Sequence, residues 1–565
     1  MTRIETIELL REDPNISVLI IGAGINGIGT FLDLALQGVD VLIVDKGDFC
    51  SGASAASSHM VHGGIRYLEN GEFRLVREAV QERNRLIENA PHYVKPLPTI
   101  IPIFKWFSGL FNAPLKFIGW LDKPSERGAV IIKAGLMMYD FYTREQGTVS
   151  RHQFKFRKDS LEQFPELNPR VICTARYYDG SMLSPERICI DLLLDGETSN
   201  PHARAINYVA AESASADAVT LRDQLTGETY RVNPKIVINA AGPWIDIANR
   251  GMGHETRFIG GTKGSHLILD HQQLRTAIGE NEFFFENKDG RIVLIFPLLD
   301  KVIVGTSDLP IDDPEHARCT DEEVDYFLEL IKIVFPDIVV DRSQIIYRFS
   351  GVRPLPASEA GTTGQISRDH SIRVLEPGQE LNFPIFNLVG GKWTSFRAFS
   401  EEAANKTLEY LHLARKISTK DLPIGGGLNF PTTEANQQEW VTAETKRTGL
   451  SEKRIKTLLN RYGSRAAGIS DYISQGEDSP LQNFTDFSQR ELCFIIQRER
   501  PVHLDDLLLR RTMLAKLGQL TKPGIVEITQ VIGEELSWSN MQIEEEILRT
   551  LDLLDHQHGI KFNER

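Results

Sequence analysis

The sequence predicts an α/β fold followed by an all-helical domain, and three observations lead to this prediction. A strand, a glycine-rich turn, a helix and a second strand follow one another between residues 17 and 45. Further apolar strands then alternate with helical segments up to about residue 415. Beyond residue 431 the chain changes to helix-forming segments with apolar residues three and four positions apart, as in packed helices.

The composition is that of a globular protein without a general affinity for nucleic acid. The 565 residues are enough for two to four domains, and 41% of them are apolar and 25% charged. The formal net charge of −14 offers no basic field for the phosphates of a nucleic acid, so we expect no such partner. Five cysteines without a CxxC pair indicate neither a disulfide framework nor a metal site. The N-terminus lacks the basic start and apolar run of a signal peptide, and no transmembrane helix is evident, so we expect a reducing, cytoplasmic location.

The first element is a βαβ unit with a glycine motif at its turn. The strand SVLII (17–21) leads into GAGING (22–27), a helix follows to residue 38, and a second strand covers 39–45. In a GxGxxG motif the first glycine permits the turn, the second admits a pyrophosphate, and the third lets helix and strand pack closely. An acid at the end of the second strand accepts ribose hydroxyls. The motif predicts a Rossmann-type dinucleotide site that includes Gly22, Gly24, Asn26, Gly27 and Asp45.

Two later elements favour FAD over NAD, which the first motif alone does not distinguish. The strand VINAAGPW (237–244) ends in small residues and Gly242, as expected where backbone passes close to a dinucleotide. The strand FNLVGG (386–391) ends at Gly390 and Gly391 and leads into a helix whose first turn carries Lys392 and Thr394. A positive helix end with a lysine stabilises the negative charge that an isoalloxazine acquires on reduction. Three separated elements closing on one cofactor describe a flavin fold.

The remaining strands and one boundary complete the predicted organisation. Strands are predicted at 236–242, 265–270, 291–297, 301–306 and 386–391. The run LPIGGGLNFP (422–431) has the proline and glycine content of a linker, and we place a domain boundary there. The prediction is an FAD-binding domain (about 15–95, 170–250 and 350–412) interleaved through residues 1–420 with a mixed-sheet substrate or cap domain (about 96–169 and 251–349), followed by a helical domain over 421–565.

Several longer motifs match one family. They are IIGAGINGIG, SAASSHMVHGGIRYLENGEFRLVREAV (54–80), GLMMYDFYT (135–143), INAAGPW, GTKGSHLIL (261–269), GRIVLIFPLLDKVIVGTSD (290–308), FSGVRPLP (349–356), ISRDHSI (366–372), VGGKWTSFR (389–397) and, in the helical tail, LDDLLLRRT (504–512). Through them the chain resembles the FAD-dependent glycerol-3-phosphate dehydrogenases of the respiratory, quinone-linked type, essentially from end to end. The resemblance implies an α/β flavoprotein that oxidises sn-glycerol 3-phosphate to dihydroxyacetone phosphate.

The resemblance also implies which side chains form the site. Hydride transfer from a secondary alcohol needs a base for the hydroxyl proton and cations that fix the phosphate group. We expect the phosphorylated polyol to be bound by Arg66, Tyr67, Arg353, Arg368, Lys392 and Thr394. Arg66 and Arg353 are also expected to take part in catalysis.

His62 is the expected proton acceptor, because an unperturbed histidine suits proton transfer near neutral pH. His266, in KGSH, is its rival, and a structural histidine remains the alternative for both. FAD is further expected to contact Ser57, Ser58, Gly63, Gly391 and Lys392.

One segment departs from the family pattern. In YYDGSMLSPERICIDL (177–192), Ser184, Pro185 and Glu186 stand where the family usually has an acidic pair before alanine and arginine. This form resembles the wider amine- and hydroxyacid-oxidising flavoproteins. A related FAD-dependent dehydrogenase or oxidase of another hydroxy acid or amine therefore remains an alternative, as does a flavin-binding regulatory protein without catalysis.

The expected electron acceptor is a membrane quinone, since no second GxGxxG in strand context marks an NAD site. The segment 96–121 contains six aromatic residues, and its only charges are Lys105 and Lys116. It predicts short helices or a helical hairpin in the inner membrane interface rather than a span. A buried cluster or a homodimer contact is the alternative. In the tail, the charges at 505–506 and 510–511 indicate only a solvated or interdomain helix face.

Overall fold

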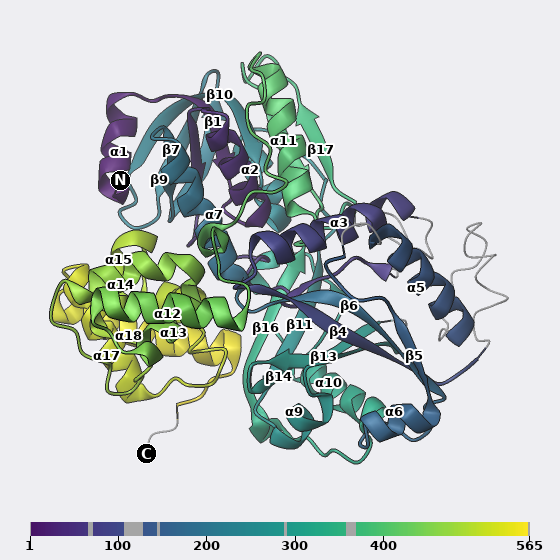
Figure 1. Cartoon of the computed structure of the whole chain (residues 1–565). Helices are drawn as coiled ribbons and strands as arrows, with labels where there is room; N and C mark the ends of the chain where they lie inside the picture. Colours follow the sequence, from purple (N-terminus) through teal and green to yellow (C-terminus); the bar gives the residue numbers. More distant parts are fainter. Residues whose placement is uncertain are drawn as a thin grey trace.

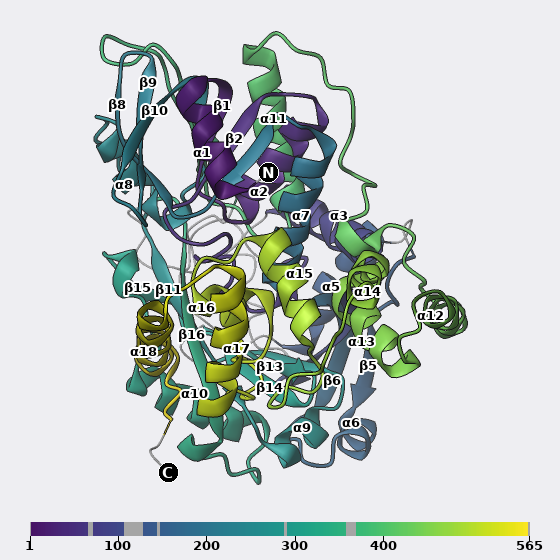
Figure 2. The same ribbon diagram turned by 90° about the vertical axis from the view of Figure 1, so that its left-hand side faces the viewer.

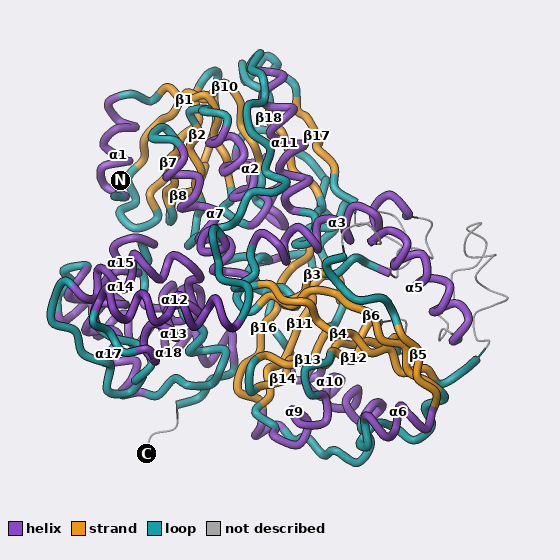
Figure 3. The backbone as a smooth tube through the Cα atoms, viewed as in Figure 1, coloured by secondary structure: helices purple, strands orange, loops and turns teal. Residues whose placement is uncertain are grey.

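The computed structural model describes residues 2–65, 72–106, 128–143, 147–287, 291–357 and 369–562. Figure 1 shows one group of strands at the top, a second group at the lower right, and the green-to-yellow C-terminal helices at the lower left. Figure 3 separates the two groups of strands clearly from the helices around them. This is the predicted α/β architecture with an all-helical C-terminal part.

The first sheet is built on the βαβ unit. Within the described ranges it has eight strands, in the order β17-β18-β10-β1-β2-β7, with β8 and β9 attached at β10. Its central strands are parallel and buried on both faces, as expected of strands covered by helices. The strands are β1 (Asn15–Ile21), β2 (Val41–Val44), β7 (Ala203–Ile206), β8 (Val209–Ser215), β9 (Ala218–Asp223), β10 (Thr229–Asn239), β17 (Ser371–Leu375) and β18 (Ile385–Val389). The helices around it are α1 (Arg3–Glu12), α2 (Ile25–Leu36), α7 (Pro185–Ser199), α8 (Ile245–Gly251) and α11 (Phe396–Tyr410).

The second sheet is mixed and mostly antiparallel. It has ten strands within the described ranges, in the order β15-β11-β14-β13-β12-β4-β6-β3, with β16 on β11 and β5 on β6. The strands are β3 (Met60–Val61), β4 (Val94–Ile103), β5 (Gln153–Phe156), β6 (Cys173–Met182), β11 (Thr262–Leu269), β12 (Glu282–Glu286), β13 (Ile292–Leu298), β14 (Lys301–Gly305), β15 (Leu309–Pro310) and β16 (Ile345–Arg353). The helices around it are α3 (Phe73–Asn89), α5 (Ala129–Thr143), α6 (Arg157–Gln163), α9 (Gln272–Ile278) and α10 (Asp321–Val334).

The five predicted strands after the βαβ unit are confirmed as β10, β11, β13, β14 and β18, with ends that differ by a few residues. The prediction of short helices over 96–121 is wrong for its first part, because residues 96–103 lie in β4 between β6 and β12. Pro96, Pro98 and Pro102 are an even number of residues apart, so their missing N–H groups fall on one edge of the strand. Residues 107–121 of the predicted segment lie outside the described residues.

The C-terminal helices share a hydrophobic core with the second sheet. Phe296, Tyr347 and Phe349 of that sheet pack with leucines and isoleucines of the tail. Figure 2 shows these helices in front of the second group of strands and below the first group. The helices are α12 (Glu434–Thr448), α13 (Glu452–Tyr462), α14 (Ala466–Ser474), α15 (Gln489–Glu499), α16 (Leu504–Asp506) with a π-turn over Leu507–Arg511, α17 (Lys522–Glu535) and α18 (Asn540–His558). The division into domains stays a prediction.

The glycine run predicted as a linker is instead tightly packed. Residues Gly425–Gly427 form a 3₁₀ turn. A Cβ on Gly426 would lie 1.9 Å from the carbonyl oxygen of Tyr462, and one on Gly427 would lie 2.1 Å from that of Asn89. Glycine is needed here for close backbone approach rather than for flexibility.

Candidate active site

The glycine motif forms the turn between β1 and α2 and packs against the end of β10. Gly22 has a φ of +100°, and a Cβ there would lie 2.7 Å from the carbonyl oxygen of Ala240. A Cβ on Gly27 would lie 2.0 Å from the carbonyl oxygen of Gly22, so the turn closes only with glycine at that position. At Gly24 a Cβ would meet only the Ser54 hydroxyl, at 3.2 Å. The space beside Gly24 is therefore the open side of the turn.

The polar groups around this turn suit a dinucleotide. The Asp45 carboxylate accepts the N–H groups of Ala23 at 2.7 Å and Gly47 at 2.9 Å, and burial raises the pKa of Asp45 to about 6. Gly24, the N-cap residue of α2, brings no side chain to the start of the helix, whose positive end can stabilise an anion. Within the part of the chain that the structure describes, the buried Oδ1 atom of Asn26 has no hydrogen-bond partner. Gly242 has a φ of +56° with nothing within 4 Å of its Cβ position. These features fit FAD.

The loop at residues 54–58 joins the elements that the sequence analysis singled out. The Ser54 hydroxyl accepts the N–H of Ile25 at 2.9 Å, and its carbonyl accepts the indole N–H of Trp393 at 3.0 Å. The Ser58 hydroxyl lies 2.8 Å from Nε2 of His266. Asn26 donates to the Gly390 carbonyl at 3.4 Å, and the backbone of Gly391 passes close to the same side chain. The start of α2, the segment before α11 and His266 of β11 therefore all contact this loop.

His266 and Arg353 lie on the paired strands β11 and β16 of the second sheet. His266 stacks on Phe349 with its ring centroid 4.9 Å away, and burial together with the Arg353 guanidinium lowers the pKa of His266 to about 3. Arg353 donates to Asp308 at 3.0 Å and to Thr306 at 2.9 Å. Its guanidinium lies against Gly264, where a Cβ would come within 2.2 Å of it. A partly buried, prepositioned guanidinium is a suitable group for recognising a phosphate.

His62 is held by its backbone at the start of α11. The Thr394 hydroxyl accepts the His62 N–H at 3.1 Å and donates to the His62 carbonyl at 3.0 Å. Thr394 is buried, and Lys392 follows Gly391 just before the helix. The structure therefore brings His62 and Thr394 together, and gives the threonine hydroxyl a role in fixing the backbone.

Gly63, the residue after His62, is held by a buried polar cluster that the sequence analysis missed. The N–H of Gly63 donates to the hydroxyl of Tyr139 and to the carboxylate of Asp179, both at 3.0 Å. The fully buried Arg83 donates to the same hydroxyl at 3.0 Å. Burial raises the pKa of Asp179, and Arg83 opposes this shift. Tyr139 and Asp179 lie within motifs quoted above, but their convergence on Gly63 has no sequence signal.

Three predicted site residues, Arg66, Tyr67 and Arg368, lie outside the described residues. Ser57 accepts the N–H of His59 at 3.3 Å, which is a local loop contact. No group of histidine, cysteine or carboxylate side chains in the described ranges is arranged to hold a metal ion.

The departure at Ser184–Glu186 lies at the contact with the C-terminal helices. Ser184 precedes α7 and Pro185 occupies its first turn, where the missing N–H has no helical partner to lose. Glu186 forms a buried ion pair with Lys516 of the tail, and Lys516 lies 3.3 Å from Nε2 of His59. The neighbouring Arg187 pairs with Glu499 at 2.5 Å. Of the three changed residues, Glu186 thus makes a contact with the C-terminal part of the chain.

Comparison with family models gives two matches. A model for "FAD dependent oxidoreductase" matches residues 17–374. A model for the "C-terminal domain of alpha-glycerophosphate oxidase" matches residues 417–543.

Named relatives and solved structures agree with these matches. A glycerol-3-phosphate dehydrogenase of Synechocystis is 30% identical over 94% of both chains. An aerobic glycerol-3-phosphate dehydrogenase of Bacillus subtilis is 29% identical over 88% of this chain and 86% of its own. The fold is similar to that of the glycerol-3-phosphate dehydrogenase from Bacillus halodurans complexed with FAD, with a TM-score of 0.75, 22% identity, and coverage of 98% of this chain and 97% of that one.

Proposed function

The chain belongs to the FAD-dependent oxidoreductases and, among them, to the glycerol-3-phosphate dehydrogenase family, and from this premise we propose that it oxidises sn-glycerol 3-phosphate to dihydroxyacetone phosphate and passes the electrons to a quinone. The observation that carries the proposal is the relation over 94% of both chains with a glycerol-3-phosphate dehydrogenase. The contacts of the 54–58 loop with Ile25, Trp393 and His266 support it.

Arg353 is the group we assign to the substrate phosphate. Its guanidinium is fixed by Asp308 and Thr306, so it meets an incoming dianion without losing much side-chain freedom. Arg66, Tyr67, Arg368 and Lys392 are proposed to complete the phosphate and polyol contacts. The net charge of −14 makes such a cationic cluster a local exception on the protein.

His62 is proposed to accept the hydroxyl proton. When bound, FAD supplies the hydride acceptor, and the chain must place the alcohol and remove its proton. His266 is poorly suited to this task, because a histidine whose pKa is about 3 does not retain a proton at neutral pH. We assign His266 to positioning the Ser58 hydroxyl instead.

Replacing His62 by asparagine is expected to lower kcat by about a hundredfold, the lower end of what a general base contributes. The matched change His266→Asn is expected to lower kcat by less than about tenfold, since asparagine still meets the Ser58 hydroxyl. Steady-state kinetics over a range of pH values measures both effects. A larger loss in His266→Asn than in His62→Asn would reverse the assignment.

The substrate is tested on the purified holoenzyme. Glycerol 3-phosphate is expected to bleach the yellow colour of the bound flavin in the absence of an acceptor, while glycerol at the same concentration leaves it unchanged, because only the phosphorylated compound engages Arg353. Turnover with a dye acceptor across other polyol phosphates, hydroxy acids and amino acids provides the comparison. Equal activity on unphosphorylated compounds would replace the proposal by another hydroxy acid or amine, and no bleaching by any of them would favour a regulatory flavoprotein.

The proposals of a quinone acceptor and of membrane association are based on an apolar face of α5. Val130, Met137, Met138 and Phe141 recur at helical spacing on its exposed side, with Met137 58% and Phe141 57% exposed. Trp106 and Phe156 are also exposed, and their ring centroids are 6.3 Å apart. No helix in the described part of the chain has the length and hydrophobicity needed to span a bilayer. We assign this face to the cytoplasmic surface of a membrane, where a quinone is available. In the assay above, vesicles carrying a quinone are expected to replace the dye as acceptor.

A further inference from the structure

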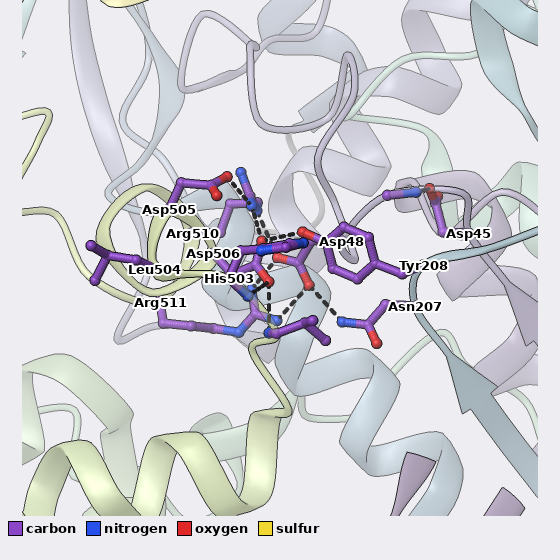
Figure 4. Close-up of polar contacts among 12 residues, drawn as sticks. Asp45, Asp48, Asn207, Tyr208, His503, Leu504, Asp505, Asp506, Arg510 and Arg511 are labelled. Carbon is purple, nitrogen blue, oxygen red and sulfur yellow. Dashed lines mark hydrogen bonds and ion pairs between the residues drawn. The ribbon is translucent and has the colours of Figure 1, made fainter. Parts of the chain in front are cut away.

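The C-terminal helices reach into the first sheet through two consecutive arginines. Arg510 and Arg511 end the π-turn that follows α16, and both are buried. Figure 4 shows them converging on the carboxylate of Asp48. Nε of Arg510 donates to Asp48 at 2.6 Å, and the two terminal nitrogens of Arg511 donate at 2.8 and 2.9 Å. Consecutive side chains of an α-helix point in different directions and rarely contact the same group. The π-turn allows Arg510 and Arg511 both to contact Asp48.

Asp48 lies in the turn that carries the proposed ribose acceptor. It is three residues beyond Asp45, whose carboxylate accepts the N–H of Ala23 in the glycine motif. The same turn returns to the motif at Cys50, whose N–H donates to the carbonyl of Ala23 at 2.9 Å. The two ends of the Asp45–Cys50 turn are thus attached to the glycine motif, and its middle is attached to the tail.

Two residues that contact this turn, Asn207 and Tyr208, are also held by the C-terminal part of the chain. The N–H of Tyr208 donates to the Gly47 carbonyl at 2.9 Å, and the Tyr208 hydroxyl donates to Asp506 at 2.6 Å. Asn207 donates to Asp48 at 3.1 Å and to the Arg500 carbonyl at 3.1 Å. Asp505 and Asp506 both accept from Arg510, which fixes the direction of that guanidinium.

The charges of Asp48, Arg510 and Arg511 hold these side chains in place. Burial favours the neutral carboxyl, but the guanidiniums of Arg511 and Arg510 outweigh it and hold the pKa of Asp48 at about 2. A buried ion cluster contributes little more to stability than apolar packing of the same volume would, while it imposes directional contacts. Removing one partner leaves an uncompensated buried charge, so the turn must rearrange.

We propose that Arg510 and Arg511 are positioning residues for FAD, which set the Asp45 turn through Asp48 and thereby make affinity for the adenosine half of the cofactor depend on the C-terminal helices. The inference rests on the proposed role of Asp45 toward the ribose. It gives a function to the charged segment that the sequence marked only as a solvated or interdomain helix face, and the structure shows the interdomain alternative.

The test uses the full-length apoprotein after removal of flavin. Asp48→Asn is expected to raise the dissociation constants of both FAD and ADP by about tenfold and by the same factor, because ADP reports on the adenosine half alone. With saturating FAD, the visible spectrum and the flavin reduction potential are expected to match those of the wild type. Arg511→Lys keeps the charge but loses the planar fork, so it is expected to give a smaller rise in the same two constants.

The matched control is Glu491→Gln. Glu491 is also a buried carboxylate that accepts two arginines, Arg454 at 2.6 Å and Arg461 at 2.9 Å, but it lies within the C-terminal helices. This variant is expected to leave both dissociation constants unchanged, even if it lowers the thermal midpoint.

The outcomes separate the inference from its premise. Wild-type constants in Asp48→Asn, or in Arg511→Lys should the first variant fail to fold, would overturn the inference, as would an equal rise in Glu491→Gln. Asp45→Asn tests the premise: if it does not weaken ADP, the role of Asp45 fails, and if it does so while Asp48→Asn has no effect, only the role of the tail fails.

Discussion

Replacing Arg353 by alanine is expected to lower kcat/KM for glycerol 3-phosphate by about a thousandfold, or about 4 kcal/mol. The guanidinium is partly buried and already oriented by Asp308 and Thr306, so the enzyme loses a preoriented, charge-assisted contact to a dianion. The negative charge of Asp308, which lies 3.0 Å from Arg353, would also remain near the site and would repel the phosphate. Steady-state kinetics with a dye acceptor measures the loss.

Two further variants define this prediction. Arg353→Lys retains a point charge without the planar fork, and an intermediate loss is expected. Arg348→Ala is the matched control, because Arg348 lies on the same strand but pairs with the exposed Asp321, and it should stay within about twofold of the wild type. If Arg353→Ala and Arg348→Ala have equal kinetics, Arg353 does not bind the phosphate.

Replacing Gly24 by alanine is expected to weaken FAD binding by at least about a hundredfold, or about 2.7 kcal/mol, while the apoprotein still folds. A Cβ at this position meets only the hydroxyl of Ser54, at 3.2 Å, so the chain tolerates it with a small shift. The new methyl group instead fills the space through which the pyrophosphate approaches the backbone. Titration of apoprotein with FAD gives the affinity, and the thermal midpoint of the apoprotein reports on folding.

Substitutions at two other glycines provide comparisons for the effect of Gly24→Ala on FAD affinity and folding. Gly27→Ala would place a Cβ 2.0 Å from the Gly22 carbonyl oxygen, so a lower thermal midpoint is expected together with the loss of FAD. Gly468→Ala, in α14, has nothing within 4 Å of its Cβ, and it should change neither quantity for the worse. Unchanged FAD affinity in Gly24→Ala would mean that the cofactor does not pass over this turn.

Local sequence was a good guide wherever the physical signal is local. The turn requires glycine at Gly22 and Gly27, and the apolar strands on either side of it are recognisable from a few consecutive residues. The helical tail is likewise predicted by its spacing of apolar residues. The motif resemblance named His266 and Arg353 separately, and the structure shows that they lie on paired strands.

Local signals misled where tertiary contacts override them. Six aromatic residues and few charges suggested short interfacial helices over 96–121, but residues 96–103 pair with β6 in the second sheet. Three glycines suggested a flexible linker, but Gly426 and Gly427 are packed against backbone carbonyls. In each case the residue type permits two conformations, and distant neighbours select one.

The sequence by itself determined the dinucleotide turn and the class of fold, because both depend on short patterns of backbone freedom and hydrophobicity, and its longer motifs indicated the family by resemblance. Only the tertiary structure decided what holds the site in place: the attachment of Gly63 to Tyr139 and Asp179, and that of Asp48 to Arg511 across 463 residues. Such contacts join side chains whose separation along the chain carries no periodic signal, so they are defined only when the sheets and the helical tail have packed together.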